Sequence, residues 1–214
     1  MMKRASINVG KIVPLRERLK GETQRAILQA AEEVFGDSGL SGARMEDIAT
    51  RAGVSVGTVY NHFEDRDALL AELIVTRRQD LLARLDAVLT STEKDGFGAQ
   101  LEQFVRAVLE HFDSHKAFLA IVLESEHARA HDLSGPRTTR PDTALLEVFR
   151  RVEELLMRGR IVGMLRPEGA EMFPSFLMAL LKGTLSRELY APTGVPLVNA
   201  APALVLFFLH GAGA

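Results

Sequence analysis

The sequence IATRAGVSVGTVYNHF, at residues 48–63, decides how this chain folds. Ile48 places a branched apolar side chain on the inner face of a short helix, and Gly53 can adopt the positive φ that ends this helix and turns the chain. Ser55 is a preferred N-cap residue, so a second helix is expected to begin directly after it. Val59 then returns to the core. The spacing predicts two short helices joined by a tight turn, which is a helix-turn-helix.

The second helix of this pair leaves small and polar side chains on its outer side. A helix of this size fits the major groove of DNA, with its N-terminal residues at the base edges. Thr58 offers a methyl group and a hydroxyl to a base, whereas Tyr60, His62 and Arg66 are suited to phosphate oxygens. The alternative is an ordinary α-hairpin in a helical bundle, against which the fixed turn and cap positions argue. The candidate DNA-binding residues from this pattern are Ser55, Val56, Gly57, Thr58, Tyr60, Asn61, His62 and Arg66.

This stretch resembles the N-terminal DNA-binding domain of TetR-family transcriptional regulators. The family pattern runs I-A-x-x-A-G-V-S-x-G-T-x-Y-x-H-F, followed by a basic residue and then Leu. The matching residues here are Ile48, Ala49, Ala52, Gly53, Val54, Ser55, Gly57, Thr58, Tyr60, His62, Phe63, Arg66 and Leu69. The chain departs from the family at Ala43 and Arg44, where Thr or Ser commonly precedes the second helix. We expect Arg44 to contact a phosphate in its place.

The resemblance implies an all-α fold with two domains. A three-helix DNA-binding domain is expected at residues 22–68, and a larger helical ligand-binding and dimerisation domain at residues 69–214. The implied function is a sequence-specific transcriptional regulator, a repressor that a small-molecule effector releases from a near-palindromic operator in double-stranded DNA. Two alternatives stay open: a DNA-binding regulator controlled by a protein partner with no small ligand, and a helical enzyme.

Composition narrows the class of protein. The chain has 214 residues, with 26 Lys and Arg against 28 Asp and Glu, for a net charge of −2. Near-neutral charge argues against a chain that coats nucleic acid along its whole length, and leaves a local basic surface possible. The absence of cysteine excludes disulfides, Cys-ligated zinc and thiol chemistry, and fits a reducing compartment, the cytoplasm.

Helical periodicity runs through the chain after a basic leader. Residues 1–21 carry six basic residues and one acidic residue, and are expected to be a flexible arm that is either solvated or in reach of a phosphate backbone. Residues 133–142 are expected to be a loop. The apolar run at residues 203–209 is too short to cross a membrane, so no membrane partner is expected. The predicted helices are 22–37, 45–51, 56–63, 65–88, 99–112, 115–131, 143–157, 170–190 and 198–209.

The last two predicted helices favour a homodimer. The final helix is apolar nearly all round, and such helices are buried. Two helices of this kind in a domain this small need a partner surface, so we expect the last two helices to pair with their copies in a four-helix interface. An intramolecular core is the alternative.

The histidines do not complete a catalytic or metal motif. His111 and His115 lie four residues apart, and Glu124, His127 and His131 follow at helical spacing. This spacing keeps a metal site open as an alternative, but it is not the HExxH motif, and a solvated helix face is the simpler reading. We therefore expect no cofactor, no bound metal and no enzymatic activity.

A pocket for a partly apolar effector is expected between the helices of the second domain. Bundle cavities form between helices whose facing side chains are apolar. Glu124 interrupts an apolar stretch and is expected to orient the ligand. The candidate ligand-binding residues are Phe104, Val108, Phe112, Phe118, Val122, Glu124 and Phe149. The alternative for each of them is ordinary core packing.

Overall fold

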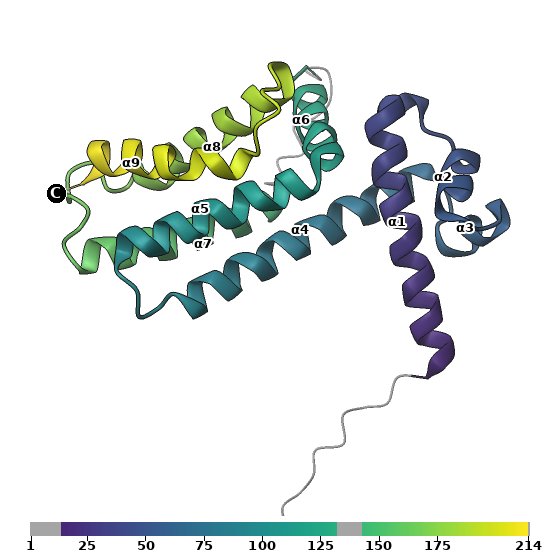
Figure 1. The fold of residues 1–214 in the computed structure, drawn as a ribbon, viewed down its shortest axis with the longest axis horizontal. Coiled ribbons are helices and arrows are strands. Elements are labelled where there is room, and N and C mark those ends of the chain that lie inside the picture. Colours follow the sequence, from purple (N-terminus) through teal and green to yellow (C-terminus); the bar gives the residue numbers. More distant parts are fainter. Residues whose placement is uncertain (1–13, 132–142, 214) are drawn as a thin grey trace, which may run out of the picture.

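The structure is a computed structural model that describes residues 14–131 and 143–213, without the side chains of residues 124–131 and 143–145. Within these ranges the protein is all-α, as predicted, and its one β pairing is an isolated bridge between Leu165 and Gly213. Figure 1 shows α1 to α3 at one end of an elongated molecule and a helical bundle at the other. The helices are α1 (Leu15–Gly42), α2 (Met45–Ala52), α3 (Val56–His62), α4 (Arg66–Ser91), α5 (Phe97–Ser114), α6 (Lys116–His131), α7 (Thr143–Ile161), α8 (Phe173–Tyr190), the 3-10 helix η1 (Leu197–Ala200) and α9 (Ala201–Ala212).

Two hydrophobic cores organise the chain, and α4 passes from one to the other. Leu69 and Leu73 of α4 are buried in the N-terminal core with residues from α1, α2 and α3. Leu81 and Leu85 are buried in the C-terminal core. Ile74 packs against both cores. The predicted boundary at residues 68 and 69 therefore falls inside one continuous helix, and the change of core occurs further along α4.

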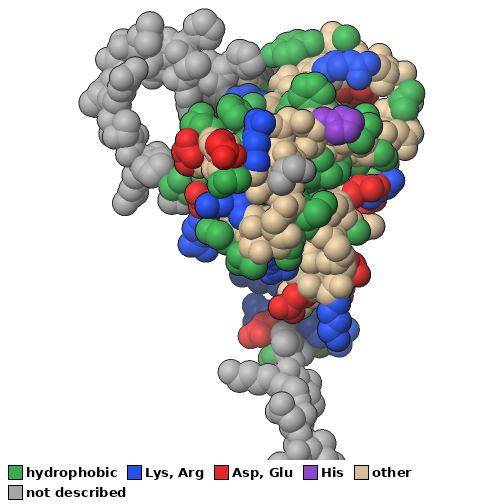
Figure 2. Space-filling view, turned by 90° about the vertical axis from the view of Figure 1, so that its left-hand side faces the viewer, with side chains coloured by type: hydrophobic (Ala, Val, Ile, Leu, Met, Phe, Trp, Pro, Cys, Tyr) green, Lys and Arg blue, Asp and Glu red, His purple; other side chains and the backbone are tan. Residues whose placement is uncertain are grey.

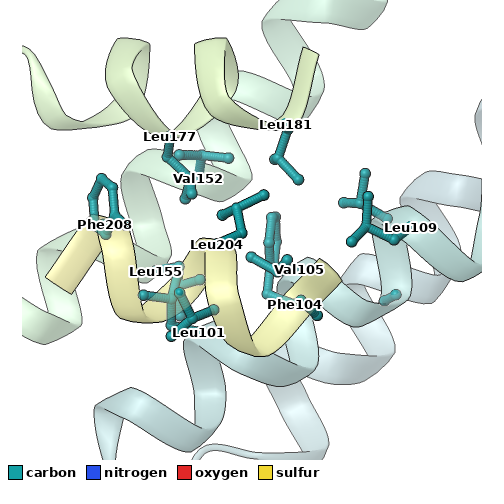
Figure 3. Close-up of a cluster of buried hydrophobic side chains, with 14 of the residues drawn as sticks. Leu101, Phe104, Val105, Leu109, Val152, Leu155, Leu177, Leu181, Leu204 and Phe208 are labelled. Atoms are coloured by element: carbon teal, nitrogen blue, oxygen red, sulfur yellow. The ribbon is translucent and has the colours of Figure 1, made fainter. Parts of the chain in front are cut away.

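The C-terminal core is formed by side chains from α4 to α9. Figure 3 shows Phe104 of α5 in this cluster, with Leu204 of α9 and Leu155 of α7 to its left and Val105 beside it. Leu177 of α8 completes this layer. Each of the five side chains is at most 7% exposed. Burial of apolar side chains on this scale is what holds these helices in one bundle, because each removes apolar surface from water.

The first helix begins earlier than predicted. α1 starts at Leu15, so the prediction of a flexible arm is wrong for residues 15–21, and residues 1–13 lie outside the described ranges. Once residues 27–35 are packed as a helix, each further residue adds a backbone hydrogen bond without a new nucleus. The Leu, Arg, Glu and Lys residues of this segment are also good helix formers. At the other end α1 kinks at Gly39, which has a φ of 71°.

The C-terminal helices differ from the prediction at their starts. α8 begins at Phe173 rather than at residue 170, because Pro174 is best accommodated in the first turn, where its missing N–H is not needed. η1 precedes α9, and the Asp113 carboxylate accepts hydrogen bonds from the backbone N–H groups of Leu197 and Val198 at 2.9 and 3.0 Å. No helix in the described part of the chain is long and apolar enough to cross a membrane.

The last helix is buried on one side only. Leu204, Val205 and Phe208 are buried, whereas Leu206 is 57% and Phe207 is 69% exposed. A shallow apolar hollow lies between α8 and α9, lined by residues that include Phe173, Phe176, Leu180, Phe207 and Phe208. Figure 2, which faces the left-hand end of the molecule in Figure 1, shows hydrophobic side chains among charged ones on the surface there.

Candidate nucleic-acid interface

Gly53 makes the turn between α2 and α3. Its φ of 69° and ψ of 29° place it in the left-handed region, which favours glycine. The Gly53 N–H donates to the Thr50 carbonyl at 3.2 Å, and the Val54 N–H reaches back to the Ala49 carbonyl at 3.0 Å. These bonds satisfy the last carbonyls of α2 and reverse the chain within two residues.

Ser55 starts the second helix of the motif. Its Oγ accepts the backbone N–H of Thr58 at 3.1 Å and lies 2.8 Å from the Thr58 Oγ1. The predicted N-cap is therefore formed. Asp65 caps α4 in the same way, accepting the Ala68 N–H at 2.7 Å. Two side-chain caps within eleven residues fix where α3 begins and where the next helix departs.

The inner and outer sides of α3 are clearly separated. Val59 is fully buried and Phe63 is 6% exposed, whereas Tyr60 is 50% exposed and Asn61 is also exposed. Gly57 is exposed as well, and a Cβ built there would meet only the Ser55 Oγ, at 3.8 Å. The packing of the protein therefore does not require this glycine, and the bare backbone faces outward.

Three other predicted residues are less exposed than expected. Val56 is half-buried and packs against the N-terminal core, so only part of its side chain faces outward. His62 is half-buried, with its ring 6.2 Å from that of Phe63. Thr58 is half-buried too, because it sits over Ser55 in the first turn. Val56 and His62 lie one helical turn from Val59, so the side of α3 that buries Val59 also covers part of them.

The two predicted arginines differ in their surroundings. Arg66 donates from Nη1 to the Leu40 carbonyl at 3.1 Å and pairs through Nη2 with Asp67 at 3.2 Å, which ties the start of α4 to the end of α1. Arg44 is the exposed N-cap residue of α2 and makes no side-chain cap bond. Ala43 beside it is 4% exposed, which explains why a small apolar residue stands there.

A polar junction that the sequence did not reveal joins the two ends of the molecule. Glu32 of α1 is 6% exposed. Its Oε2 accepts the Arg77 Nε of α4 at 2.6 Å, and its Oε1 lies 3.1 Å from the Nδ1 of His115, directly before α6. Both oxygens of one buried carboxylate thus hold two further helices. A lone Glu on the apolar side of α1 was the only sign of it in the sequence.

Close packing of α1 against α6 surrounds this junction. A Cβ added to Gly36 would lie 2.5 Å from the Ala117 Cβ, so only glycine allows this approach. One turn further along α6, Ile121 is 2% exposed and belongs to the N-terminal core. The DNA-binding end is therefore closed by a helix that the sequence assigned to the second domain.

His111 is enclosed beside the junction. It is 1% exposed, and neither ring nitrogen has a hydrogen-bond partner in the described structure. Burial lowers the pKa of His111 from 6.5 to about 4, and the positive charges of His115 and Arg84 act in the same direction. The His111 and His115 ring centroids are 4.9 Å apart.

The alternative of a histidine metal site gains no support from the side chains in view. Among the residues searched, no three His, Asp or Glu side chains come together in a way that could hold a metal ion. The side chains of Glu124, His127 and His131 lie outside the described ranges.

Most of the predicted effector-binding residues pack in the C-terminal core. Phe104, Val108, Phe112 and Phe118 are each at most 8% exposed, and the last two stack at a centroid distance of 6.0 Å. Val122 and Phe149 are half-buried, and Glu124 is outside the described side chains. Two hollows on the described surface lie elsewhere, one between α8 and α9 and one beside Asp47 and Arg51 between α1 and α2.

Comparison with known proteins agrees with this geometry. Residues 27–73 match the family profile of bacterial regulatory proteins, tetR family. The chain is 26% identical over 144 residues to the HTH-type transcriptional repressor KstR2 of Mycolicibacterium smegmatis, covering 66% of this chain and 67% of that protein. It is 28% identical over 182 residues to the HTH-type transcriptional repressor BepR of Brucella suis, covering 83% and 85%. The crystal structure of the transcriptional regulator FadR from Bacillus subtilis in complex with stearoyl-CoA has a TM-score of 0.71 at 17% identity, covering 87% of this chain and 98% of that one.

The fold and the outward face of α3 define a helix-turn-helix DNA-binding transcriptional regulator. Residues 27–73 thus match the DNA-binding domain of the TetR family of bacterial regulators, and the chain resembles TetR-family regulators in its fold.

Proposed function

We propose that this regulator is a cytoplasmic repressor that binds a near-palindromic operator as a homodimer and is released by a small-molecule effector. The observation that carries the DNA-binding part is the capped helix α3, whose Gly57, Tyr60 and Asn61 face outward from a fully buried Val59. A short helix held this firmly presents a fixed set of groups to base edges, which is what sequence-specific reading requires.

The proposed residue roles follow from exposure and chemistry. Thr58 and the exposed part of Val56 contact base edges, with Asn61 beside them, while Gly57 lets the backbone come close to the DNA. Tyr60, His62 and Arg44 contact phosphates. Arg44 is free of the bonds that hold Arg66 to Leu40 and Asp67. We therefore expect Arg44 to contribute more to phosphate binding than Arg66.

Selection of binding sites tests these roles. Duplexes with random central sequence, selected by repeated binding to the wild-type protein, are expected to converge on an inverted repeat. Thr58→Ala is then expected to change the preferred base at one position of each half-site, at a cost of about 1–3 kcal/mol for the wild-type site. Arg44→Ala is expected to weaken binding to selected and random duplexes alike. The absence of any selected sequence would contradict the proposed function.

The exposed apolar side chains of α8 and α9 support the homodimer. Phe207 is 69% and Phe176 is 51% exposed, and both line the hollow between these helices. Monomers rarely leave such side chains together in water. Phe207→Asp is expected to convert a dimer into a monomer in sedimentation velocity, and to abolish binding to the full inverted repeat. A wild-type protein that sediments as a monomer at micromolar concentration would contradict the dimer.

A small effector is proposed to act through α4 and the Glu32 junction. α4 begins beside the reading helix and ends in the C-terminal core, and Glu32 holds α1 to both α4 and the start of α6. A ligand that moves α6 or α4 therefore changes the direction of α3. Allosteric coupling of about 1–3 kcal/mol would change operator affinity about 5–150-fold.

An apolar chain is the proposed effector chemistry. The aromatic residues Phe104, Phe112 and Phe118 favour it, and the FadR structure holds stearoyl-CoA in a similar fold. Stearoyl-CoA and free stearate are the probes for this proposal, with operator binding measured by fluorescence anisotropy. We expect a fall in operator affinity with one of them, and no effect of coenzyme A alone.

A protein partner is the second candidate for control of DNA binding. The observation that favours it is that the predicted pocket residues Phe104, Val108, Phe112 and Phe118 are packed against one another. If operator affinity does not respond to apolar ligands of any chain length, but falls when a second purified protein binds the C-terminal domain, control by a partner replaces control by an effector.

A further inference from the structure

The first three turns of α1, residues 15–26, extend beyond the core of the DNA-binding domain. Every residue from Leu15 to Lys20 is exposed, and the first buried residue of the helix is Ile27. Twelve helical residues span about 18 Å. Figure 1 shows this part of α1 projecting past α2 and α3, away from α8 and α9. We call residues 15–26 the α1 extension.

The α1 extension is basic, and three of its cations make no ion pair with any described side chain. It holds four basic and two acidic residues, and the sequence before it adds Lys3, Arg4 and Lys11. Over the portion of the chain with described side chains, Arg16, Arg18 and Lys20 pair with no carboxylate. Arg25 is different, because its Nε donates to the Gly21 carbonyl. Three neighbouring cations thus stand free in water at the end of the domain that binds DNA.

We propose that the α1 extension binds the sugar-phosphate backbone of DNA outside the half-site that α3 reads. This inference rests on the proposed function. Two observations select duplex DNA as the partner: the charge of the extension is opposite to that of phosphate, and the extension is continuous with the helix that packs behind α2 and α3. If the dimer forms through α8 and α9, the extension points outward along the duplex, away from the symmetry axis.

An anionic membrane is a less suitable partner for this surface. Helices that lie in a membrane interface present a broad apolar face opposite their basic one. The α1 extension offers only Leu15 and Leu19 for such a face, at 68% and 53% exposure.

The contacts of the α1 extension with DNA would be independent of base sequence, because phosphate groups carry no sequence information. They would add affinity and salt dependence without changing which operator is chosen.

The test compares two triple variants of the full-length protein. R16A/R18A/K20A removes the free cations of the α1 extension. K94A/R150A/R160A removes three exposed cations from the C-terminal domain and gives the same net charge. Alanine keeps the helical propensity of the exposed segment, so both variants are expected to retain the wild-type unfolding midpoint. The probes are a 60-base-pair duplex with the selected inverted repeat at its centre, and the same site trimmed to the outer edges of its half-sites.

We expect the wild-type protein and K94A/R150A/R160A to bind the long duplex more tightly than the trimmed one. R16A/R18A/K20A is expected to bind both equally. Its plot of log affinity against log salt concentration should be shallower by about 0.9 for each phosphate that the variant no longer neutralises. Its preferred operator sequence should not change.

Two outcomes would overturn the inference while leaving the proposed function intact. One is a wild-type protein that binds the long and trimmed sites equally. The other is R16A/R18A/K20A with unchanged DNA binding and a loss of binding to phosphatidylserine vesicles, which would assign the surface to a membrane. Failure of the wild-type protein to select any duplex is a third, separate result, and it would overturn the proposed function itself.

Discussion

The two cores of this protein are made from the same kinds of apolar side chain, but they differ in how much each depends on particular residues. In the N-terminal core, the path of the chain depends on single residues with special geometry, above all Gly53 in its left-handed turn and Ser55 as a cap. In the C-terminal core, long helices pack through Leu, Val and Phe side chains, and similar apolar residues would serve. Function is therefore readable from sequence where geometry demands one residue type, and hidden where volume alone is required.

The cores are also less separate than their sequences suggest. Ile121 of α6 lies in the N-terminal core, Glu32 of α1 binds Arg77 and His115, and Gly36 touches Ala117. Four experiments, in order of decreasing expected effect, test the contacts that join the two cores and the residues that stabilise each one.

Removing the carboxylate of the junction is expected to have the largest effect. Glu32→Ala leaves Arg77, whose side chain is 14% exposed, without its buried partner. The free energy of unfolding is expected to fall by about 3–5 kcal/mol, measured by urea denaturation. The matched control is Glu33→Ala, which removes an exposed pair with Arg51 and should cost less than about 1 kcal/mol. Equal losses in the two variants would mean that the junction does not stabilise the protein.

Ile121→Ala tests whether α6 is part of the N-terminal core. Loss of this buried side chain is expected to cost about 3 kcal/mol. Amide hydrogen exchange should quicken in α1, because α6 packs against α1 and Ile121 belongs to the N-terminal core. Leu119→Ala, two residues away on the same helix, should instead quicken exchange in the C-terminal helices. The same exchange pattern in both variants would show that the two cores act as one.

Acidification is expected to destabilise the protein through His111. The folded protein keeps this ring neutral down to its pKa of about 4, whereas the unfolded chain takes up the proton near pH 6.5. Between these values the unfolded state binds more protons, so the free energy of unfolding falls as the pH is lowered. Well below pH 4, the lowered pKa of His111 reduces the free energy of unfolding by roughly 3 kcal/mol, and at pH 5 the reduction is smaller. His111→Phe should flatten the pH dependence of stability over this range, and an unchanged slope would contradict it.

The N-cap of α3 is expected to give the smallest change in stability. Ser55→Ala removes the acceptor for the Thr58 N–H and should cost about 1 kcal/mol of unfolding free energy. Ser55→Asn, which retains a capping oxygen, should cost much less. In thermal unfolding the first variant should lower the midpoint and the second should stay close to the wild-type value. Identical midpoints for Ser55→Ala and wild type would show that the cap does not hold α3 in place.

The sequence predicted the helices near residues 48–63 to within a residue or two, because Gly53 and Ser55 act locally and mark where one helix stops and the next starts. It misplaced the start of α1, since the Leu, Arg, Glu and Lys residues of 15–21 are compatible with a solvated arm and with a helix continued from a packed neighbour. It also listed Val56 among the DNA-binding residues of the outer side, with no sign that Val56 packs against the core. Half-burial of Val56 depends on how closely α3 approaches the core, and no spacing rule gives that distance.

The amino-acid sequence by itself determined the helix-turn-helix, the all-α class and the resemblance to TetR-family regulators, because these depend on local conformational preferences repeated at fixed spacings. Only the tertiary structure decided that Glu32 meets Arg77 and His115, and that Ile121 closes the N-terminal core. It also decided that His111 is enclosed without a hydrogen-bond partner in the described structure. These contacts join residues far apart along the chain, and which of them meet depends on how the helices pack, a property of the whole fold and not of any one segment.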